Sequence, residues 1–163
     1  FRAAMTGHQV YSTLHTNSAL GAIPRLLDIG IVPDILAGNI IGVIAQRLIR
    51  RLCKHCKQAY QASPAEGKIV GARPDRPTTL YRAVGCDHCD YQGYRGRVAI
   101  MELLKLDGEL DEMIARRVTA RELLKAAIAK GFRTLADDGI RRVLDGSTSL
   151  DELGRVVDLT DRM

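Results

Sequence analysis

The chain has 163 residues, of which 46% are hydrophobic and 26% are charged, a composition typical of a folded soluble protein and not of a disordered one. Five tyrosines, two phenylalanines and no tryptophan are few for the stacking platforms that bind single-stranded nucleic acid. The net charge of +5 favours an anionic partner without identifying one. No apolar run approaches the roughly 20 residues of a membrane span, so a membrane-spanning segment is excluded.

The first residues lack both an initiator methionine and the long apolar stretch of a signal peptide. We therefore expect a cytosolic protein of which this chain is a piece. A length of 163 residues predicts one domain or a small pair of domains.

The first third of the chain predicts an α/β layer with a mostly parallel sheet. A helix end at residues 3–5 precedes a β-rich strand at 10–14, and a helix with apolar residues spaced three and four apart follows at 20–27. Pro33 marks the start of a new element, and the spacing of isoleucines and leucines predicts a helix over 34–51, about 27 Å long. A strand at 10–14 without most of its sheet would leave an exposed edge able to pair with another chain.

The remainder predicts a small irregular module, a returning strand and short helices. Residues 61–77 carry few large apolar side chains, which predicts an exposed loop, whereas 97–104 is typical of a strand. Two capping-box patterns, Thr119 with Glu122 and Ser149 with Glu152, and stops at Gly131 and Gly146 predict a C-terminal helical bundle. The predicted boundaries are 1–52 for the α/β part, 53–95 for the module, 96–106 for the strand and 107–163 for the helices.

All four cysteines fall in two Cys-x-x-Cys pairs, Cys53 with Cys56 and Cys86 with Cys89, separated by 29 residues. Two such pairs supply the four thiolates of a tetrahedral zinc site. The separation exceeds the commonest spacing of about 15 to 20 residues, which fits a looped-out insertion. Two disulfides or four unrelated buried thiols are the alternatives, and disulfides are disfavoured in a cytosolic chain. A site with four cysteine ligands is closed to water, so we expect the zinc to be structural.

Histidines occur inside the cysteine pairs and around the predicted strand at 10–14. His55 and His88 are not needed as ligands, and we interpret them as exposed residues, hydrogen-bond donors to the ligands or contacts to a partner. His15, Thr16 and Asn17 follow the strand, at the end where open α/β sheets bind ligands. From the residues alone a packing or capping role for His15 is the commoner outcome.

The run Thr6-Gly7-His8 with residues 12–17 resembles the histidine box of the secretion ATPase superfamily, the hexameric motors of type II secretion and type IV pilus assembly. The resemblance covers essentially the whole chain. It continues through residues 25–28 with Gly30, 45–48, 50–53, the four cysteines, 93–97, 131–135 and 138–139. Pilus-retraction motors of this superfamily typically lack the cysteine module, so the resemblance points to the secretion or pilus-extension branch.

The resemblance implies the C-terminal part of a RecA-like P-loop ATPase core, with a four-cysteine zinc insertion and a C-terminal helical bundle. It makes His15 a residue near the terminal phosphate of ATP with Thr13, Thr16 and Asn17 as neighbours, and Arg47 a nucleotide or subunit contact. His8 would brace the sheet. The sequence contains no Gly-x-x-x-x-Gly-Lys-Ser/Thr phosphate loop, so we expect this chain alone not to hydrolyse ATP.

Further implications concern the parent protein. It would bind ATP and Mg, form a hexamer in the cytoplasm and act on platform proteins at the inner membrane, with no nucleic acid expected. A zinc-ribbon module that binds nucleic acid or protein remains the alternative from the residues.

Arg47, Arg50 and Arg51 lie in the predicted helix over 34–51, followed by Lys54 and Lys57, with no acidic residue between 41 and 60. These cations could complement the helix dipole, contact a neighbouring subunit or a phosphate, or face a membrane-associated partner.

Overall fold

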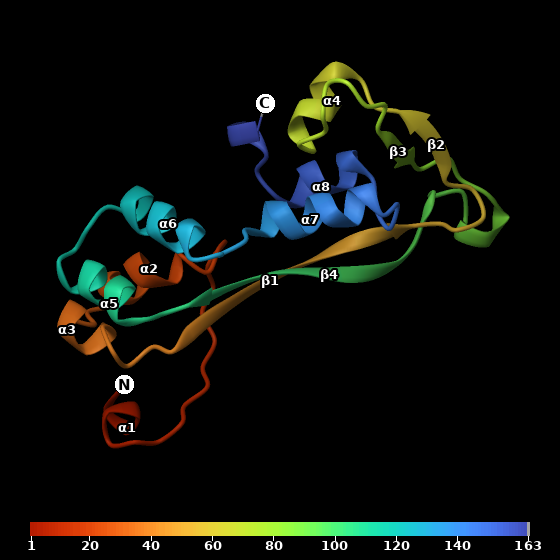
Figure 1. Cartoon of the computed structure of the whole chain (residues 1–163). Helices are drawn as coiled ribbons and strands as arrows, with labels where there is room; N and C mark the ends of the chain where they lie inside the picture. The colour runs from red at the N-terminus through yellow and green to blue at the C-terminus, as the bar shows by residue number, and fades with distance from the viewer. Residues whose placement is uncertain (163) are drawn as a thin grey trace. The chain divides into compact units, whose positions relative to one another are not determined.

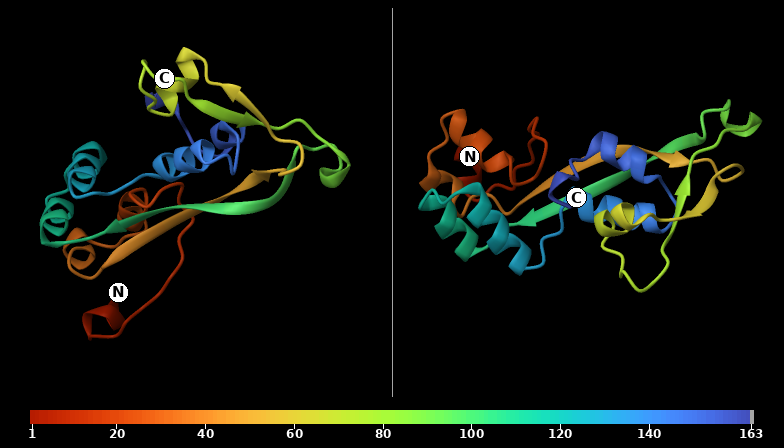
Figure 2. Two further views of the ribbon diagram at one scale, coloured as in Figure 1. Left: turned by 45° about the vertical axis from the view of Figure 1, so that its right-hand side comes forward. Right: turned by 90° about the horizontal axis from the view of Figure 1, so that it is seen from above.

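The computed structural model describes residues 1–162, whose contacts divide the chain into two compact units (Figure 1). Phe1–Ala45 and Met101–Thr134 form the first unit, whereas Gln46–Ile100 and the chain from Leu135 onward form the second. Strands β1 (Gly42–Leu52) and β4 (Tyr94–Lys105) pair in a two-stranded sheet and contribute residues to both units. They run in opposite directions (Figure 2). The four-part division expected from the sequence remains a prediction.

The first unit contains short helices together with the start of β1 and the end of β4. These helices are α1 (Arg2–Met5), α2 (Ala22–Asp28), α3 (Pro33–Leu36), α5 (Gly108–Ala115) and α6 (Ala120–Ala129). Helix α3 contacts α2 and α5, and α5 contacts α6. Buried side chains of α2, α3, α5, α6 and β4, together with the flanking residues Ala19 and Leu106, form one apolar core. Its members are Ala19, Ile23, Leu26, Leu36, Leu104, Leu106, Leu110, Ile114, Leu123 and Ala127.

The second unit combines a second strand pair with two helices. Strands β2 (Gln58–Gln61) and β3 (Thr79–Arg82) are antiparallel, with Gln58 opposite Arg82 and Gln61 opposite Thr79. Helices α7 (Leu135–Leu144) and α8 (Leu150–Val156) contact each other and β3. The remaining elements are α4 (Pro64–Ile69) and the 3-10 turns η1 (Asp87–Cys89) and η2 (Thr160–Arg162).

The helix predicted over 34–51 is wrong, because the structure has the short α3 followed by strand β1. Helix α3 stops after one turn, and Gly38 just beyond it has a φ of +76°, a conformation that glycine adopts readily. From residue 42 to 49 the exposure alternates with a period of two, as in a strand with one covered face. The amide of Leu106 donates to the carbonyl of Ile41 at 3.2 Å, which joins the end of β4 to the start of β1.

The strand predicted at 10–14 is also absent, since the structure assigns no regular element to residues 8–16. Val10, Tyr11 and Leu14 are exposed. Residues of high strand propensity form a strand only when a neighbouring strand supplies hydrogen bonds, and no strand of residues 1–162 pairs with this segment. Within residues 1–162 the expected parallel sheet is not formed either, because both strand pairs are antiparallel. The strand predicted at 97–104 is confirmed by β4.

Residues 61–77 are not a plain loop, because they contain the end of β2 and helix α4. Ser63 and Glu66 form a complete capping box, with Pro64 in the first turn of the helix. The Ser-x-x-Glu pattern and the proline were the signals for this helix in the sequence.

The short helices predicted after residue 107 are confirmed, with stops at Gly131 and Gly146, both of positive φ. The capping box of Thr119 and Glu122 is complete. Ser149 accepts the amide of Glu152, but the Glu152 carboxylate binds Arg50 instead of closing the second box. Helices α5 and α6 belong to the first unit and α7 and α8 to the second, so a single bundle is not confirmed.

Candidate metal centre

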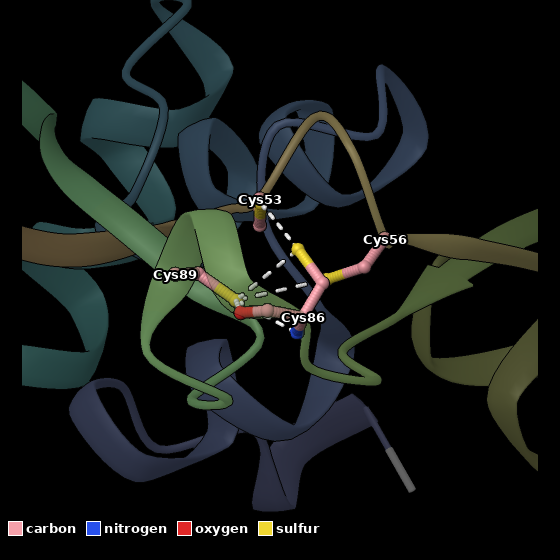
Figure 3. A group of neighbouring side chains, drawn as sticks. All are labelled: Cys53, Cys56, Cys86 and Cys89. Atoms are coloured by element: carbon pink, nitrogen blue, oxygen red, sulfur yellow. Dashed lines mark hydrogen bonds between the residues drawn. The ribbon is translucent and has the colours of Figure 1, made fainter.

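Two chain turns bring the four cysteines together in the second unit (Figure 3). Cys53 directly follows β1 and Cys56 lies just before β2, whereas Cys86 directly precedes the turn η1 and Cys89 is the last residue of that turn. Their sulfur atoms all lie within 4.8 Å of one another. Cys53 and Cys89 are buried, and Cys56 and Cys86 are partly exposed.

The sulfur separations fit a tetrahedral metal site. The Sγ atoms of Cys53 and Cys86 are 3.9 Å apart, and those of Cys56 and Cys89 and of Cys86 and Cys89 are 3.8 Å apart. A zinc ion with Zn–S bonds of about 2.3 Å implies tetrahedral S–S edges of about 3.8 Å. A disulfide requires about 2.05 Å, and all four cysteines are free. The residues therefore fit a closed zinc site with four cysteine ligands, and the two-disulfide alternative does not describe this structure.

The backbone around η1 donates hydrogen bonds to the sulfur atoms. The amide of Gly85 points to Cys56 Sγ at 3.3 Å, and the amides of Cys86 and Gly93 point to Cys89 Sγ at 3.3 and 3.2 Å. Donors of this kind stabilise thiolates.

Two glycines allow the close backbone approach at this turn, and the sequence motifs did not single out this role. A Cβ atom at Gly85 would lie 2.6 Å from the carbonyl oxygen of Tyr91, and one at Gly93 would lie 2.6 Å from the Cβ of Ala83. Both glycines have positive φ angles. One glycine directly before the second Cys-x-x-Cys pair and another shortly after it were the available signal in the sequence.

The thiols differ in how easily they ionise. Burial and the neighbouring thiols raise the pKa of Cys86 to about 12. Burial also opposes ionisation of Cys89, but the amide hydrogen bonds from Cys86 and Gly93 outweigh it and lower that pKa to about 7. One thiolate is thus favoured while a second beside it is costly, and a divalent cation would remove this cost by neutralising the cluster.

His55 and His88 lie beside the sulfur cluster and are not part of it. Both are exposed, and their rings stack with centroids 4.0 Å apart. Arg95 donates to the backbone carbonyl of His88 at 2.9 Å. The stacked pair joins the two turns on the outside of the cysteine cluster.

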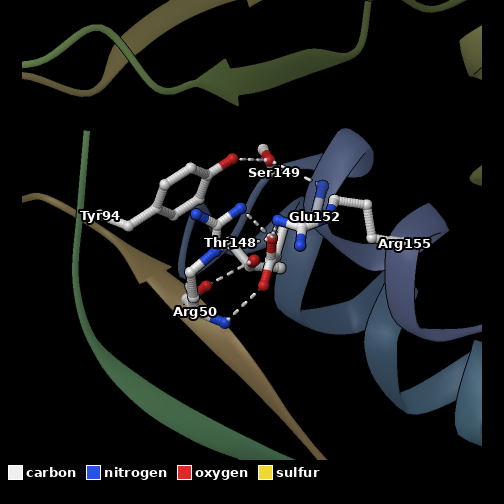
Figure 4. Close-up of polar contacts among 6 residues, drawn as sticks. All are labelled: Arg50, Tyr94, Thr148, Ser149, Glu152 and Arg155. Atoms are coloured by element: carbon white, nitrogen blue, oxygen red, sulfur yellow. Dashed lines mark hydrogen bonds and ion pairs between the residues drawn. The ribbon is translucent and has the colours of Figure 1, made fainter. Parts of the chain in front are cut away.

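Arg50 joins β1 to helix α8, close to the cysteines in sequence (Figure 4). Its side chain donates to Glu152 Oε2 from Nε at 2.9 Å and from Nη2 at 2.5 Å, and its amide donates to Oε1 at 3.0 Å. The guanidinium also lies over the Tyr94 ring, 4.2 Å from its centroid. Arg50 therefore has structural partners within its own unit, and because it lies in a strand, the helix-dipole interpretation of this cation is wrong.

Other contacts join the cysteine turns to the segment between α7 and α8. Lys57, next to Cys56, donates to the carbonyl of Gly146 at 2.8 Å and lies over the Tyr81 ring. The amide of Leu52, next to Cys53, donates to the carbonyl of Ser147 at 2.9 Å. The Thr148 hydroxyl donates to the carbonyl of Arg50 at 2.8 Å. The cysteine cluster and the two helices are consequently held in one hydrogen-bonded body.

The nucleotide-site candidates of the first unit lie in the extended segment before α2. Thr13, His15 and Asn17 are exposed, whereas Thr16 is partly buried and donates its hydroxyl to the carbonyl of Ser18 at 3.0 Å. Arg47 lies on β1 in the second unit and is partly buried.

His8 does not brace a sheet in the described part of the chain. It is exposed, and its Nδ1 lies 3.1 Å from the hydroxyl of Thr6. The roles expected for Thr13, His15, Thr16, Asn17 and Arg47 stay predictions.

Comparison with known proteins identifies the class of this chain. Residues 1–155 match the family described as type II/IV secretion system protein. The chain therefore belongs to the family of type II/IV secretion system proteins.

Individual relatives of this chain are named as proteins of type II secretion or type IV pilus assembly. The chain is 46% identical over 155 residues to the type II secretion system protein E of Pseudomonas aeruginosa, which covers 95% of this chain and 31% of the relative. It is 43% identical over 155 residues to the type II secretion system ATPase E of Vibrio cholerae, again 95% of this chain and 31% of the relative. It is 42% identical over 159 residues to the type IV pilus assembly ATPase PilB of Thermus thermophilus, 93% of this chain and 17% of the relative. The chain thus spans less than a third of the length of these relatives.

Proposed function

We propose that this chain is the C-terminal portion of a hexameric ATPase that powers type II protein secretion or type IV pilus assembly. The observation that carries the proposal is the family match over residues 1–155 together with the close cluster of four cysteines. Relatives named as ATPases of both systems align over most of this chain. Its fold would then be part of a RecA-like core, with a zinc-binding insertion and a helical C-terminal region.

The nucleotide chemistry is divided between this chain and the rest of the parent. No phosphate-loop motif occurs in the 163 residues, so the lysine and backbone cradle for ATP phosphates and Mg must come from elsewhere. Here His15 would sense or position the terminal phosphate beside Thr13 and Thr16. Asn17 and Arg47 would contact the nucleotide or a neighbouring subunit. The exposure of His15 leaves its ring available for such a contact.

Zinc would be held by Cys53, Cys56, Cys86 and Cys89. Four thiolates fill its tetrahedral coordination, so it would supply folding energy and no reaction chemistry. The contacts from Arg50, Leu52 and Lys57 to Glu152, Ser147 and Gly146 would extend its rigidity to α7 and α8. A rigid arm of this kind suits a motor that transmits movement to another protein.

The parent would act in the cytoplasm on platform proteins at the inner membrane. None of the helices in residues 1–162 combines the length and apolar character that a membrane span requires. We propose that membrane association depends on partner proteins.

The test compares ATP turnover of the intact parent with that of its His15→Ala variant. We expect kcat to fall by about tenfold or more, the range lost with a group that acts in the transition state, without a change in thermal unfolding temperature. Gln9→Ala is the matched control, because Gln9 is exposed in the same segment and its side chain donates to the hydroxyl of the exposed Tyr11. Unchanged turnover of His15→Ala would remove its assigned role. Turnover by the 163-residue chain alone would contradict the division of the nucleotide site.

A further inference from the structure

Glu102 is a buried carboxylate in the first unit that the metal centre does not use. It is 4% exposed and lies on β4 between the exposed side chains of Met101 and Leu103. Its neighbours on the covered face are Ile100 and Leu104, which are almost fully buried. A carboxylate in such surroundings is costly unless hydrogen bonds satisfy it.

One partner of this carboxylate is a backbone amide far away in the sequence. The amide of Ala19 donates to Glu102 Oε1 at 2.5 Å, across 83 residues of chain, and Ala19 is itself fully buried. The contact ties the chain at Ala19 to β4.

Ala19 is the point at which the exposed histidine segment enters the core. Residues 8–15 are exposed without regular structure, and Ala19 is the first buried residue after them. The intervening turn has its own hydrogen bonds, from the Thr16 hydroxyl to the carbonyl of Ser18 and from the amide of Gly21 to the Ser18 hydroxyl, both 3.0 Å. The first of these bonds joins Thr16 to Ser18, the neighbour of Ala19, so the position of Ala19 affects where the preceding residues 15–17 lie.

We propose that Glu102 is a positioning residue that holds the turn bearing His15, Thr16 and Asn17 by fixing Ala19 to β4. The inference rests on the proposed function for its consequence in catalysis, since His15 is the candidate for contact with the terminal phosphate and Thr16 and Asn17 lie next to it in the chain. Glu102 does not touch the nucleotide. It acts through the backbone, and small displacements of a positioned group lower a rate strongly.

The side-chain chemistry sets an order among variants. Glu102→Ala removes the acceptor and leaves the buried amide of Ala19 without it, whereas Glu102→Gln retains an amide oxygen of the same reach. Glu102→Gln should therefore rescue most of the effect of Glu102→Ala. If Glu102 only filled space, Glu102→Leu would behave like the wild type, because the two side chains are similar in size. Under our proposal the acceptor oxygen is required, so Glu102→Leu should behave like Glu102→Ala.

The experiment measures kcat and KM for ATP, together with hydrogen–deuterium exchange over residues 14–21, in the intact parent. We expect Glu102→Ala to lower kcat about tenfold with KM changed by less than about twofold, since the phosphate cradle lies elsewhere. Exchange over 16–21 should become faster. Glu152→Ala is the matched control, because Glu152 is equally buried at 4% exposed but binds Arg50 in the second unit. It should leave exchange over 16–21 and kcat per folded site unchanged.

Two outcomes separate this inference from the function on which it rests. Unchanged exchange over 16–21 in Glu102→Ala, or a kcat loss equalled by Glu152→Ala, would overturn the positioning role. Faster exchange over 16–21 in Glu102→Ala, with ATP turnover unchanged in both Glu102→Ala and His15→Ala, would support the positioning role of Glu102 but overturn the phosphate role of the turn.

Discussion

Glu152 carries a dense set of polar contacts in the second unit. It is 4% exposed and accepts from the amide and guanidinium of Arg50 and from the guanidinium of Arg155. Burial raises its pKa, but the hydrogen bonds and charge of Arg50 outweigh burial and hold that pKa below its usual value. Losing one partner of such a buried pair leaves the other group unsatisfied.

This pair makes stability depend on pH in a defined direction. A carboxyl group whose pKa is lower in the folded chain adds stability above its unfolded pKa, about 4.3, and that stability is lost as the pH falls through the folded value. We expect Glu152→Gln to lower the free energy of unfolding by about 2 kcal/mol at pH 7, and the difference from wild type to shrink below about pH 4. Urea unfolding at a series of pH values measures both.

Glu112→Gln is the control for this prediction. Glu112 pairs with Arg116 on the surface, where the two side chains are 60% and 72% exposed, so its loss should change the free energy of unfolding by less than about 0.5 kcal/mol. Equal effects of the two variants, or a Glu152→Gln difference that grows in acid, would show that the Arg50 pair does not stabilise the fold.

At the scale of elements, the packing of α7 on α8 depends on a glycine. A Cβ atom at Gly139 in α7 would collide with the side-chain methyl groups of Leu153, which is fully buried in α8 and cannot move aside freely. Alanine normally stabilises a helix by about 1 kcal/mol relative to glycine. At Gly139 the collision should instead make alanine destabilising relative to glycine.

We expect Gly139→Ala to lower the thermal unfolding temperature, with an overpacking cost of about 1–3 kcal/mol. Gly154→Ala in α8 is the matched substitution, because its Cβ would meet only Leu159 Cδ1, at an ordinary 3.9 Å. It should raise the unfolding temperature through helix propensity alone. Calorimetry on both variants tests the pair, and two changes of the same sign would argue against close contact of α7 and α8.

Comparison of the observed helices and strands with the expected ones shows which sequence signals were sufficient to predict an element. Helices with local caps were predictable, because Thr119 with Glu122 and the stop at Gly131 are settled by neighbouring residues. The apolar residues of the run 42–49 fit a helical spacing and do not alternate with polar ones, and the pairing with β4, which the sequence does not reveal, makes this run a strand. Residues 10–14 had the propensity of a strand without a partner in the described part of the chain. The four cysteines were predictable by spacing, but the Glu102 contact to Ala19 spans 83 residues and left no local pattern.

For the whole molecule, the central feature is the link between the cysteine cluster and the C-terminal helices of the second unit. Gly146, Ser147 and Thr148 all bond to residues at the ends of the first cysteine turn or of β1. A metal held at the cluster would thus stabilise chain segments that are far apart in the sequence, by 98 residues at the contact of Arg50 with Thr148. Structural zinc sites contribute apparent binding energies of order 10 kcal/mol, comparable to the whole stability of a domain.

Native mass spectrometry of the purified chain and of its Cys86→Ser variant tests this claim most directly, because it counts the metal ions bound to each folded molecule. We predict one zinc ion on the wild-type chain, and none on Cys86→Ser, whose spectrum should also shift to the higher charge states of an unfolded protein. A wild-type chain that carries no zinc and keeps the charge-state distribution of a folded protein would contradict the account.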